Sequence, residues 1–193
     1  MRRLGVVLVL LVGLVACGVP GDSDPRAIEA ENVPFGLLAP TAEATTTTQP
    51  SAFTATDRVT IYLADADGKL QSVRRQVTAP SSVAKAIESL LGGPTEEEAD
   101  RLSTAITSET KLLGVQGPDD GLVILDLSRQ LLDITGRQQI LALAQVVWTA
   151  TALPSVDRVL FEFEGEQAEV QNGNGTLTSS PLGRLSYRDL IAE

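Results

Sequence analysis

The stretch at residues 122–163 constrains the fold most, because three elements of different periodicity follow one another in it. Residues 122–127 are apolar except for Asp126 and include two β-branched side chains, which is typical of a strand covered on at least one face. Residues 111–116 are expected to pair with them as a hairpin across the Gly/Pro/Asp turn at residues 117–121. A helical pattern and an alternating strand pattern follow. The stretch therefore predicts a strand, a helix and a second strand that fold as one unit.

The helical pattern has a start signal and a stop signal. Thr135 is followed three residues later by Gln138, an arrangement that satisfies free amides at a helix start, so we expect the helix to begin at Thr135. Pro154 cannot continue the backbone ladder and ends the helix. One broad face is expected to be buried. Its residues are Ile140, Leu143, Ala144, Val147 and Thr151, flanked by Leu141 and Trp148, and those on the opposite side are Gln138, Ala142, Gln145 and Thr149.

The second strand is predicted at residues 156–164, where apolar and polar side chains alternate with the period of a half-covered strand. Gly165-Glu166 is expected to form a two-residue turn that leads to a short strand at residues 168–170. The large aromatic side chains of this unit are interpreted as core residues rather than as a ligand-stacking surface, since burial is their usual role. They are Trp148, Phe161 and Phe163.

A second hairpin is predicted upstream, from the alternating residues 59–63 and the strand-like residues 70–77. Asp67-Gly68 between them is a strong signal for a tight hairpin turn. Residues 65–68 also resemble the start of a calcium loop, but the later oxygen ligands and the closing Glu are missing. The pattern therefore favours a turn over a metal site.

Two helix starts follow this hairpin. Ser82 is expected to cap a helix that ends at Gly92-Gly-Pro94. Thr95 and Glu98 form a capping box, and the acidic run there is interpreted as a solvated helix start. Near the end of the chain, Ser186 is expected to cap a final turn. The apolar stripe of the first helix consists of Val83, Ala86, Ile87, Leu90 and Leu91.

The order of these elements predicts the fold class. Two β-hairpins, each followed by a helix, and a further strand pair give the order β-β-α-β-β-α-β-β. We therefore expect an α+β domain with a mostly antiparallel sheet and helices packed on one face. The order also hints at an internal duplication, although no residue-level repeat supports it.

The N-terminus has the features of an export signal. Arg2-Arg3 precedes an apolar run at residues 4–16, which is shorter than the roughly 20 residues that a membrane-spanning helix needs. Residues 1–16 are therefore predicted to be a signal peptide. After its removal the formal charge changes from −10 to −12, because two arginines and no acidic residue are lost. So acidic a chain is not expected to bind nucleic acid.

The remainder of the chain divides by composition. Residues 17–56 are rich in Pro and Thr and poor in apolar periodicity, so they are predicted to be a disordered tether. Residues 57–171 contain the predicted elements and form the expected folded domain. Residues 172–193 are treated as a C-terminal extension. Cys17 is the single cysteine, which leaves no internal disulfide.

The composition excludes several kinds of catalytic chemistry. The chain has no histidine, which removes Ser-His-Asp and Cys-His catalysis and the common zinc sites that contain histidine. Neither phosphate-binding glycine motif is present, so no cofactor or metal site is expected. Asp126 and Asp133 remain as a carboxylate pair for acid/base hydrolysis of a glycan. Asp126 could equally accept backbone amides in a local turn.

Leu14-Val-Ala-Cys17, after the charged and apolar segments, closely resembles the lipobox of bacterial lipoproteins. The resemblance implies cleavage before Cys17 and attachment of fatty acyl chains, such as palmitate, to that cysteine. The alternative is an ordinary signal peptide followed by a free thiol. A single acyl chain anchors a protein only marginally, but two or three would hold it firmly at the outer face of the cell membrane.

Several segments between residues 58 and 170 together carry a resemblance to a known family: residues 59–63, 90–95, 112–115, 125–128, 141–153 and 156–161. They resemble the GerMN domain of sporulation and spore-germination proteins, in the version found on actinobacterial lipoproteins. The resemblance implies a compact α+β domain outside the membrane that acts in envelope assemblies. Some related lipoproteins are linked to sensor kinases, and the family brings no established catalytic residues.

Taken together, these features predict a non-catalytic, lipid-anchored binding or assembly module of the cell envelope. Its expected partner is another envelope protein, a cell-wall ligand or a small ligand, together with the membrane through Cys17. The alternative is a cell-wall glycan hydrolase that uses paired carboxylates such as Asp126 and Asp133.

Overall fold

The computed structural model describes residues 54–192. The predicted signal peptide, Cys17 and nearly all of the predicted tether lie outside the described residues, so those predictions stay open. Among the helices that are described, none is long and apolar enough to cross a bilayer.

The N-terminal hairpin is present as predicted. Strands β1 (Thr56–Ala64) and β2 (Leu70–Thr78) pair in antiparallel register. In the turn, Asp65 Oδ1 accepts hydrogen bonds from the N–H groups of Asp67 (3.0 Å) and Lys69 (2.9 Å). The bond from Lys69 is the main cause that lowers the pKa of Asp65. Asp65 therefore stabilises a turn, as the sequence indicates.

Helices α2 (Val83–Leu91) and α3 (Glu96–Ala99) begin with the caps that the sequence predicts. Ser82 accepts a hydrogen bond from the Lys85 N–H at 3.3 Å. Thr95 and Glu98 form a capping box, in which Glu98 Oε2 accepts from the Thr95 N–H at 3.0 Å. The buried stripe of α2 faces β1, β2 and the longest helix of the domain.

The second sheet is built on the unit that the sequence singles out. Its strands are β3 (Leu112–Asp119), β4 (Leu122–Leu127), β5 (Arg158–Phe163) and β6 (Glu166–Gln167), in that spatial order. β4 and β5 are parallel, whereas the other pairs are antiparallel. The short 3₁₀ helix η3 (Arg129–Leu131) and helix α4 (Arg137–Ala150) connect β4 to β5. Phe161 and Phe163 on β5 are buried core residues, as predicted.

The predicted start of α4 is wrong by two residues. The helix begins at Arg137, with Gly136 as its N-cap and no side-chain cap bond. Gly136 has φ 62° and ψ −140°, a conformation that favours glycine. Because Gly136 occupies the cap, Thr135 lies outside the helix and its pairing with Gln138 does not form a capping box.

The predicted turn after β5 is also displaced by one residue. The two positions of positive φ are Glu164 (54°) and Gly165 (81°), so the turn is Glu164-Gly165 and not Gly165-Glu166. This places β6 at Glu166–Gln167. The strand predicted at residues 168–170 is replaced by β7 (Val170–Gln171), which pairs with β8 (Leu177–Thr178) in a small third sheet.

The C-terminal segment folds onto the domain. Leu182 forms an antiparallel bridge with Val159, and the 3₁₀ segment η4 (Arg184–Leu190) buries Tyr187. The Tyr187 hydroxyl donates to the carbonyl of Gln171 at 2.6 Å, and burial raises the pKa of this phenol. Ser186 is not a cap, because no described N–H donates to its hydroxyl; η4 begins after Gly183 and has a kink at Tyr187.

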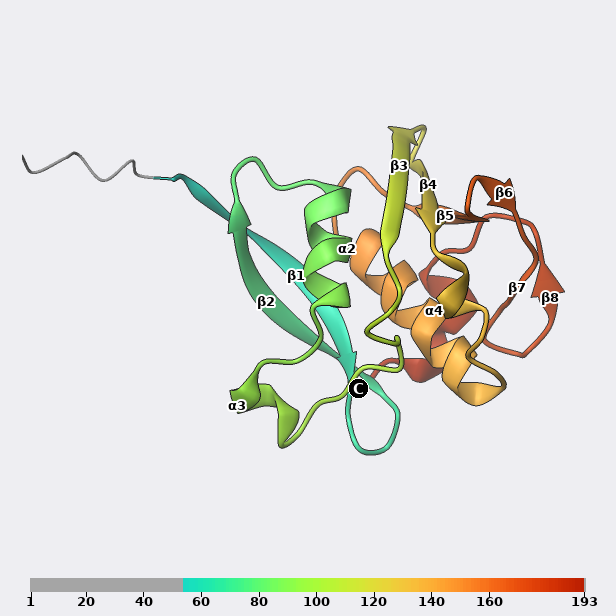
Figure 1. Ribbon diagram of the computed structural model, residues 1–193, viewed down its shortest axis with the longest axis horizontal. Coiled ribbons are helices and arrows are strands. Elements are labelled where there is room, and N and C mark those ends of the chain that lie inside the picture. The colour runs from blue at the N-terminus through green and yellow to red at the C-terminus, as the bar shows by residue number, and fades with distance from the viewer. Residues whose placement is uncertain (1–53, 193) are drawn as a thin grey trace, which may run out of the picture. The chain divides into compact units, whose positions relative to one another are not determined.

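The predicted α+β class with mostly antiparallel strands is confirmed, and the strands are divided among three sheets. Figure 1 shows α2 and α4 between the β1–β2 hairpin and the sheet of β3 to β6. α4 is buried around almost its whole circumference, including Gln145 and Thr149 on the side opposite the predicted face. Gln145 Nε2 donates to the Tyr62 carbonyl (3.0 Å), and the Tyr62 N–H donates to Thr149 Oγ1 (3.0 Å). These two polar residues thus pair the backbone groups of Tyr62 that face away from β2.

Candidate functional site

The carboxylates proposed for hydrolysis occupy structural or exposed positions. Asp126 Oδ1 on β4 accepts a hydrogen bond from the Gly165 N–H at 3.1 Å, which fixes the turn between β5 and β6. Asp133 is exposed in the connection between η3 and α4. Neither residue lines the pocket described next. The geometry therefore gives no support to a glycan hydrolase built on this pair.

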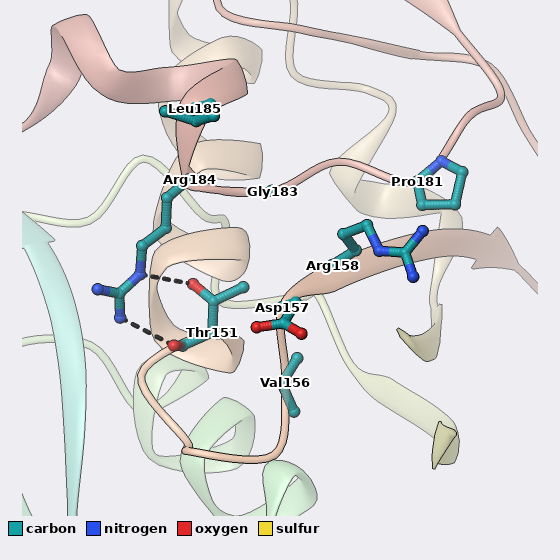
Figure 2. Close-up of a pocket in the computed structure, with 8 residues that line it drawn as sticks. All are labelled: Thr151, Val156, Asp157, Arg158, Pro181, Gly183, Arg184 and Leu185. Atoms are coloured by element: carbon teal, nitrogen blue, oxygen red, sulfur yellow. Dashed lines mark hydrogen bonds between the residues drawn. The ribbon is translucent and has the colours of Figure 1, made fainter. Parts of the chain in front are cut away.

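A surface pocket with a volume of about 510 Å³ lies where the end of α4, the start of β5 and the C-terminal segment meet. Figure 2 shows these three segments around the hollow, each contributing side chains. Its apolar lining comes chiefly from Val156, Pro181 and the side chain of Leu185, which is 83% exposed. The remaining lining residues are Thr151, Asp157, Arg158, Gly183 and Arg184.

Arg184 is held in a fixed position on one wall of the pocket. Its Nε and Nη2 atoms donate to Oγ1 (3.0 Å) and to the carbonyl oxygen (2.9 Å) of Thr151, the two bonds drawn in Figure 2. The guanidinium carbon also lies 4.8 Å from the ring centroid of Trp148, in cation–π geometry. Thr151 in turn donates to the Val147 carbonyl at 2.7 Å. The end of α4 therefore orients this arginine through three contacts.

The other wall is positioned by a backbone contact between distant segments. The N–H groups of Asp157 (2.7 Å) and Arg158 (3.0 Å) both donate to the carbonyl of Gly121. Arg158 Nη2 donates to the Asp120 carbonyl at 3.3 Å. Figure 2 shows the Asp157 carboxylate between Thr151 and the Arg158 side chain. The pocket thus presents one carboxylate and two arginines beside an apolar surface.

This arrangement suits recognition of a ligand more than bond cleavage. Arginine stays protonated at all working pH values, so neither guanidinium can serve as a general base. Within residues 54–192 no group of three Asp, Glu, Cys or His side chains is placed to hold a metal ion. Figure 2 shows the two guanidinium groups on opposite sides of the hollow with the Asp157 carboxylate between them, so the site offers separate polar groups beside an apolar wall, an arrangement that can orient a ligand with both polar and apolar parts.

No pattern in the sequence predicts this pocket. Arg158 and Arg184 belong to no recognisable motif, and the pocket forms only because the C-terminal segment bridges to β5 through Leu182 and Val159. The one related prediction was that Trp148 packs in the core. Trp148 is half-buried against Tyr62, with 5.3 Å between ring centroids, and its buried Nε1 has no hydrogen-bond partner in the described part of the chain.

Comparison with known families gives the decisive observation. Residues 60–169 match the Germane family, which is described as "Sporulation and spore germination". The chain belongs to this family. The match spans more than half of the chain and covers β1 to β6. It stops before Pro181, Gly183 and Arg184, so one wall of the pocket lies beyond the Germane match.

Two solved structures support the assignment of the Germane domain. The chain is similar to the tandem GerMN domains of the sporulation protein GerM from Bacillus subtilis, with 26% identity, a TM-score of 0.55 and coverage of 72% of this chain. It spans about half (49%) of that structure. The first GerMN domain of the same protein gives 25% identity and a TM-score of 0.52, with coverage of 67% of this chain and 98% of the other. No curated protein matches in sequence.

Proposed function

We propose that this Germane-family protein is a lipid-anchored, extracytoplasmic protein whose domain is a non-catalytic binding or assembly module of the cell envelope. The family match and the similarity to GerM domains support a role of the sporulation or germination type, and a sensor-linked role is the variant that the proposal also includes. The partner is another envelope protein or a cell-wall ligand. The formal net charge of −10 disfavours nucleic acid as the partner, because phosphate binding relies on positive charge.

The observation that carries the proposal is the fixed geometry of the pocket beside α4. Arg184 is bound by Thr151 and stacked on Trp148, so its orientation does not depend on a ligand. Preorganised side chains lower the entropy lost on binding, which favours recognition. The exposed Leu185 beside it offers an apolar anchor of the kind that partner proteins bury.

Membrane attachment through Cys17 explains where such a module acts. The sequence Leu14-Val-Ala-Cys17 follows an apolar run, and acylation of Cys17 would retain the domain at the outer face of the membrane. Mass spectrometry of the mature N-terminus should find a diacyl or triacyl cysteine. The Cys17→Ser variant should lose the lipid and leave the membrane fraction. An unmodified Cys17 in the wild-type protein would contradict this part of the proposal.

Binding at the pocket is tested separately, in intact membranes. A photo-crosslinking amino acid placed at position 185 should give one defined adduct with an envelope protein or cell-wall fragment. The same amino acid at the exposed position of Glu109, which is not a pocket residue, serves as the matched control. Absence of any adduct at position 185, or an identical adduct at both positions, would argue against the pocket as a binding site.

A further inference from the structure

We propose that the outer edge of β2 is a second binding surface, which pairs with an extended segment of a partner protein carrying an acidic side chain between two apolar ones. The inference rests on the proposed role as a binding module and names the chemistry of one partner segment. It involves the N-terminal hairpin and not the pocket beside α4.

The register of the hairpin determines which backbone groups of β2 point outward. The Asp65 N–H donates to the Lys69 carbonyl, so these two residues form a hydrogen-bonded pair. Hydrogen-bonded and non-hydrogen-bonded pairs then alternate along the two strands, as far as the pair of Thr56 and Thr78. Ser72, Arg74 and Gln76 therefore direct their N–H and C=O groups away from β1. No described residue forms a backbone hydrogen bond with these groups. The edge thus offers three donors and three acceptors for a further strand.

Other parts of the hairpin edges are closed. On β1, the outward groups of Tyr62 are bound by Gln145 and Thr149, and Ala64 pairs with Ser103. At the two ends of β2, the Leu70 carbonyl accepts from the Ala192 N–H and the Thr78 carbonyl accepts from Lys85 Nζ. The central part of β2 is open, as are the outward groups of Arg58 and Thr60 on β1 among the described residues, but only β2 lies beside the groove described next. Figure 1 shows β2 at the margin of the domain.

A groove of about 530 Å³ runs along this free edge. Its floor and wall include Val73 on β2 and Leu102 after α3, both partly buried apolar residues. A strand added to β2 would point alternate side chains to this face of the hairpin, because successive side chains alternate between faces. Two apolar side chains flanking one residue of the partner would therefore lie over Val73 and Leu102.

The charges around the groove select an acidic residue between these two apolar ones. Arg74 and Arg101 line the groove, and neither forms an ion pair within residues 54–192. Both acidic lining residues are already engaged: Glu98 binds Arg75, and Asp65 accepts hydrogen bonds in its own turn and from Gln71 Nε2. A carboxylate on the added strand directly opposite Arg74 would form a cross-strand pair on the exposed face.

A second copy of this chain is disfavoured by the same residue. Antiparallel pairing of two β2 edges through all three free residues would centre on Arg74, since Ser72 and Gln76 lie symmetrically about it. The two Arg74 side chains would then be directly opposite each other, and like charges in that position destabilise a strand pair. The β2 edge therefore favours pairing with a strand of a different sequence.

The probe that tests this proposal is a capped peptide, Thr-Val-Glu-Val-Thr, added to the full mature chain from position 17 with the Cys17→Ser change. Hydrogen exchange of the Ser72, Arg74 and Gln76 amides should slow about tenfold or more at saturation, while amides of α4 stay unchanged. The peptide Thr-Val-Lys-Val-Thr is the matched control and should bind about tenfold more weakly.

Two variants of the protein separate edge pairing from non-specific charge attraction. Arg74→Glu should reverse the preference between the two peptides, because its side chain is exposed and only its charge changes. Ser72→Pro removes an outward N–H that has no internal partner, so the hairpin should stay folded while peptide binding is lost. Binding that both variants retain, or no binding of the acidic peptide to the wild type, would overturn the proposal.

Failure here is distinguishable from failure of the proposed function. One outcome is that the crosslinked partner at position 185 is still recovered from Arg74→Glu and Ser72→Pro, while neither peptide slows hydrogen exchange at the β2 edge. In that case the module binds through the pocket, and the β2 surface is not used. If sedimentation shows a wild-type dimer that Ser72→Pro dissociates, the edge pairs with a second copy of this chain, and the proposed partner segment is wrong.

Discussion

Single polar side chains in this domain stabilise contacts between segments that are far apart in sequence. Glu98 caps α3 through the Thr95 N–H and also binds Arg75 on β2. Arg184 binds Thr151 at the end of α4 and stacks on Trp148. In both cases part of the charged group is bound inside the protein. We expect both side chains to affect stability, and Arg184 to affect binding at the pocket as well.

The Glu98 pair predicts a specific pH dependence of stability. The hydrogen bond from Arg75 is the main cause that lowers the pKa of Glu98 from 4.5 to about 2. A lowered pKa in the folded state means that the contribution is complete above the unfolded-state pKa and is lost as pH falls from about 4.5 to 2. Glu98→Gln should reduce the free energy of unfolding by about 1–2 kcal/mol at pH 7, and by little at pH 2.

Chemical denaturation of Glu98→Gln at several pH values checks this prediction. Glu97→Gln is the matched control, because Glu97 is exposed in the same turn of α3 and takes part in neither the capping box nor the ion pair. If the difference in the free energy of unfolding between wild type and Glu98→Gln stays constant from pH 7 to pH 2, the ion pair with Arg75 does not lower the pKa of Glu98.

Arg184 gives a second prediction at the scale of single residues. Arg184→Ala removes two hydrogen bonds and the contact with Trp148, so the free energy of unfolding should fall by about 1–3 kcal/mol. Because Trp148 is the single tryptophan, its fluorescence emission should shift to longer wavelength as water reaches the ring. Arg188→Ala is the control, since Arg188 is exposed and pairs only with the exposed Asp189. Unchanged emission in Arg184→Ala would disprove the stacking.

At the scale of secondary structure, local patterns predicted the hairpins and the capped helices, because turns and caps depend on neighbouring residues. They did not predict the environment of α4. Gln145 and Thr149 look like solvent-facing residues of an amphipathic helix, yet both are fully buried. They are buried because the edge of β1 needs hydrogen-bond partners, a requirement set by tertiary packing. The pocket was missed for a related reason, since its walls come from segments that only the fold brings together.

The role of Gln145 leads to the prediction at this scale. Its Oε1 accepts from the Ala105 N–H (2.8 Å) and its Nε2 donates to the Tyr62 carbonyl (3.0 Å). Gln145→Ala leaves both buried backbone groups unpaired, so the free energy of unfolding should fall by about 2–4 kcal/mol. Gln138→Ala, at an exposed position near the start of α4, should change it by less than about 0.5 kcal/mol. Equal effects of the two substitutions in thermal denaturation would contradict the edge-closing role.

At the scale of the whole domain, the folded unit extends beyond the Germane match, which ends at residue 169. Leu182 adds a bridge to the edge of β5 at Val159, and Tyr187 fills the space beside the β7–β8 sheet with 1% of its surface exposed. The segment that composition separates as a C-terminal extension therefore supplies core residues and one wall of the pocket. We expect this segment to fold and unfold cooperatively with the rest of the domain.

Removal of residues 172–193 tests this integration directly. The truncation deletes the buried side chains of Leu182 and Tyr187 and uncovers Val159 and Trp148. Each large buried side chain contributes about 2–5 kcal/mol, so the loss of two should reach roughly 4–10 kcal/mol, which is comparable to the whole stability of a small domain. The truncated protein should therefore lose cooperative thermal unfolding and show fast hydrogen exchange in β5 and α4.

Leu177→Ser, at a position that is 57% exposed, is the control within the same segment and should unfold like the wild type. If the truncated protein instead unfolds cooperatively at the wild-type midpoint, the C-terminal segment is an appendage, and the pocket wall that contains Arg184 contributes nothing to the fold.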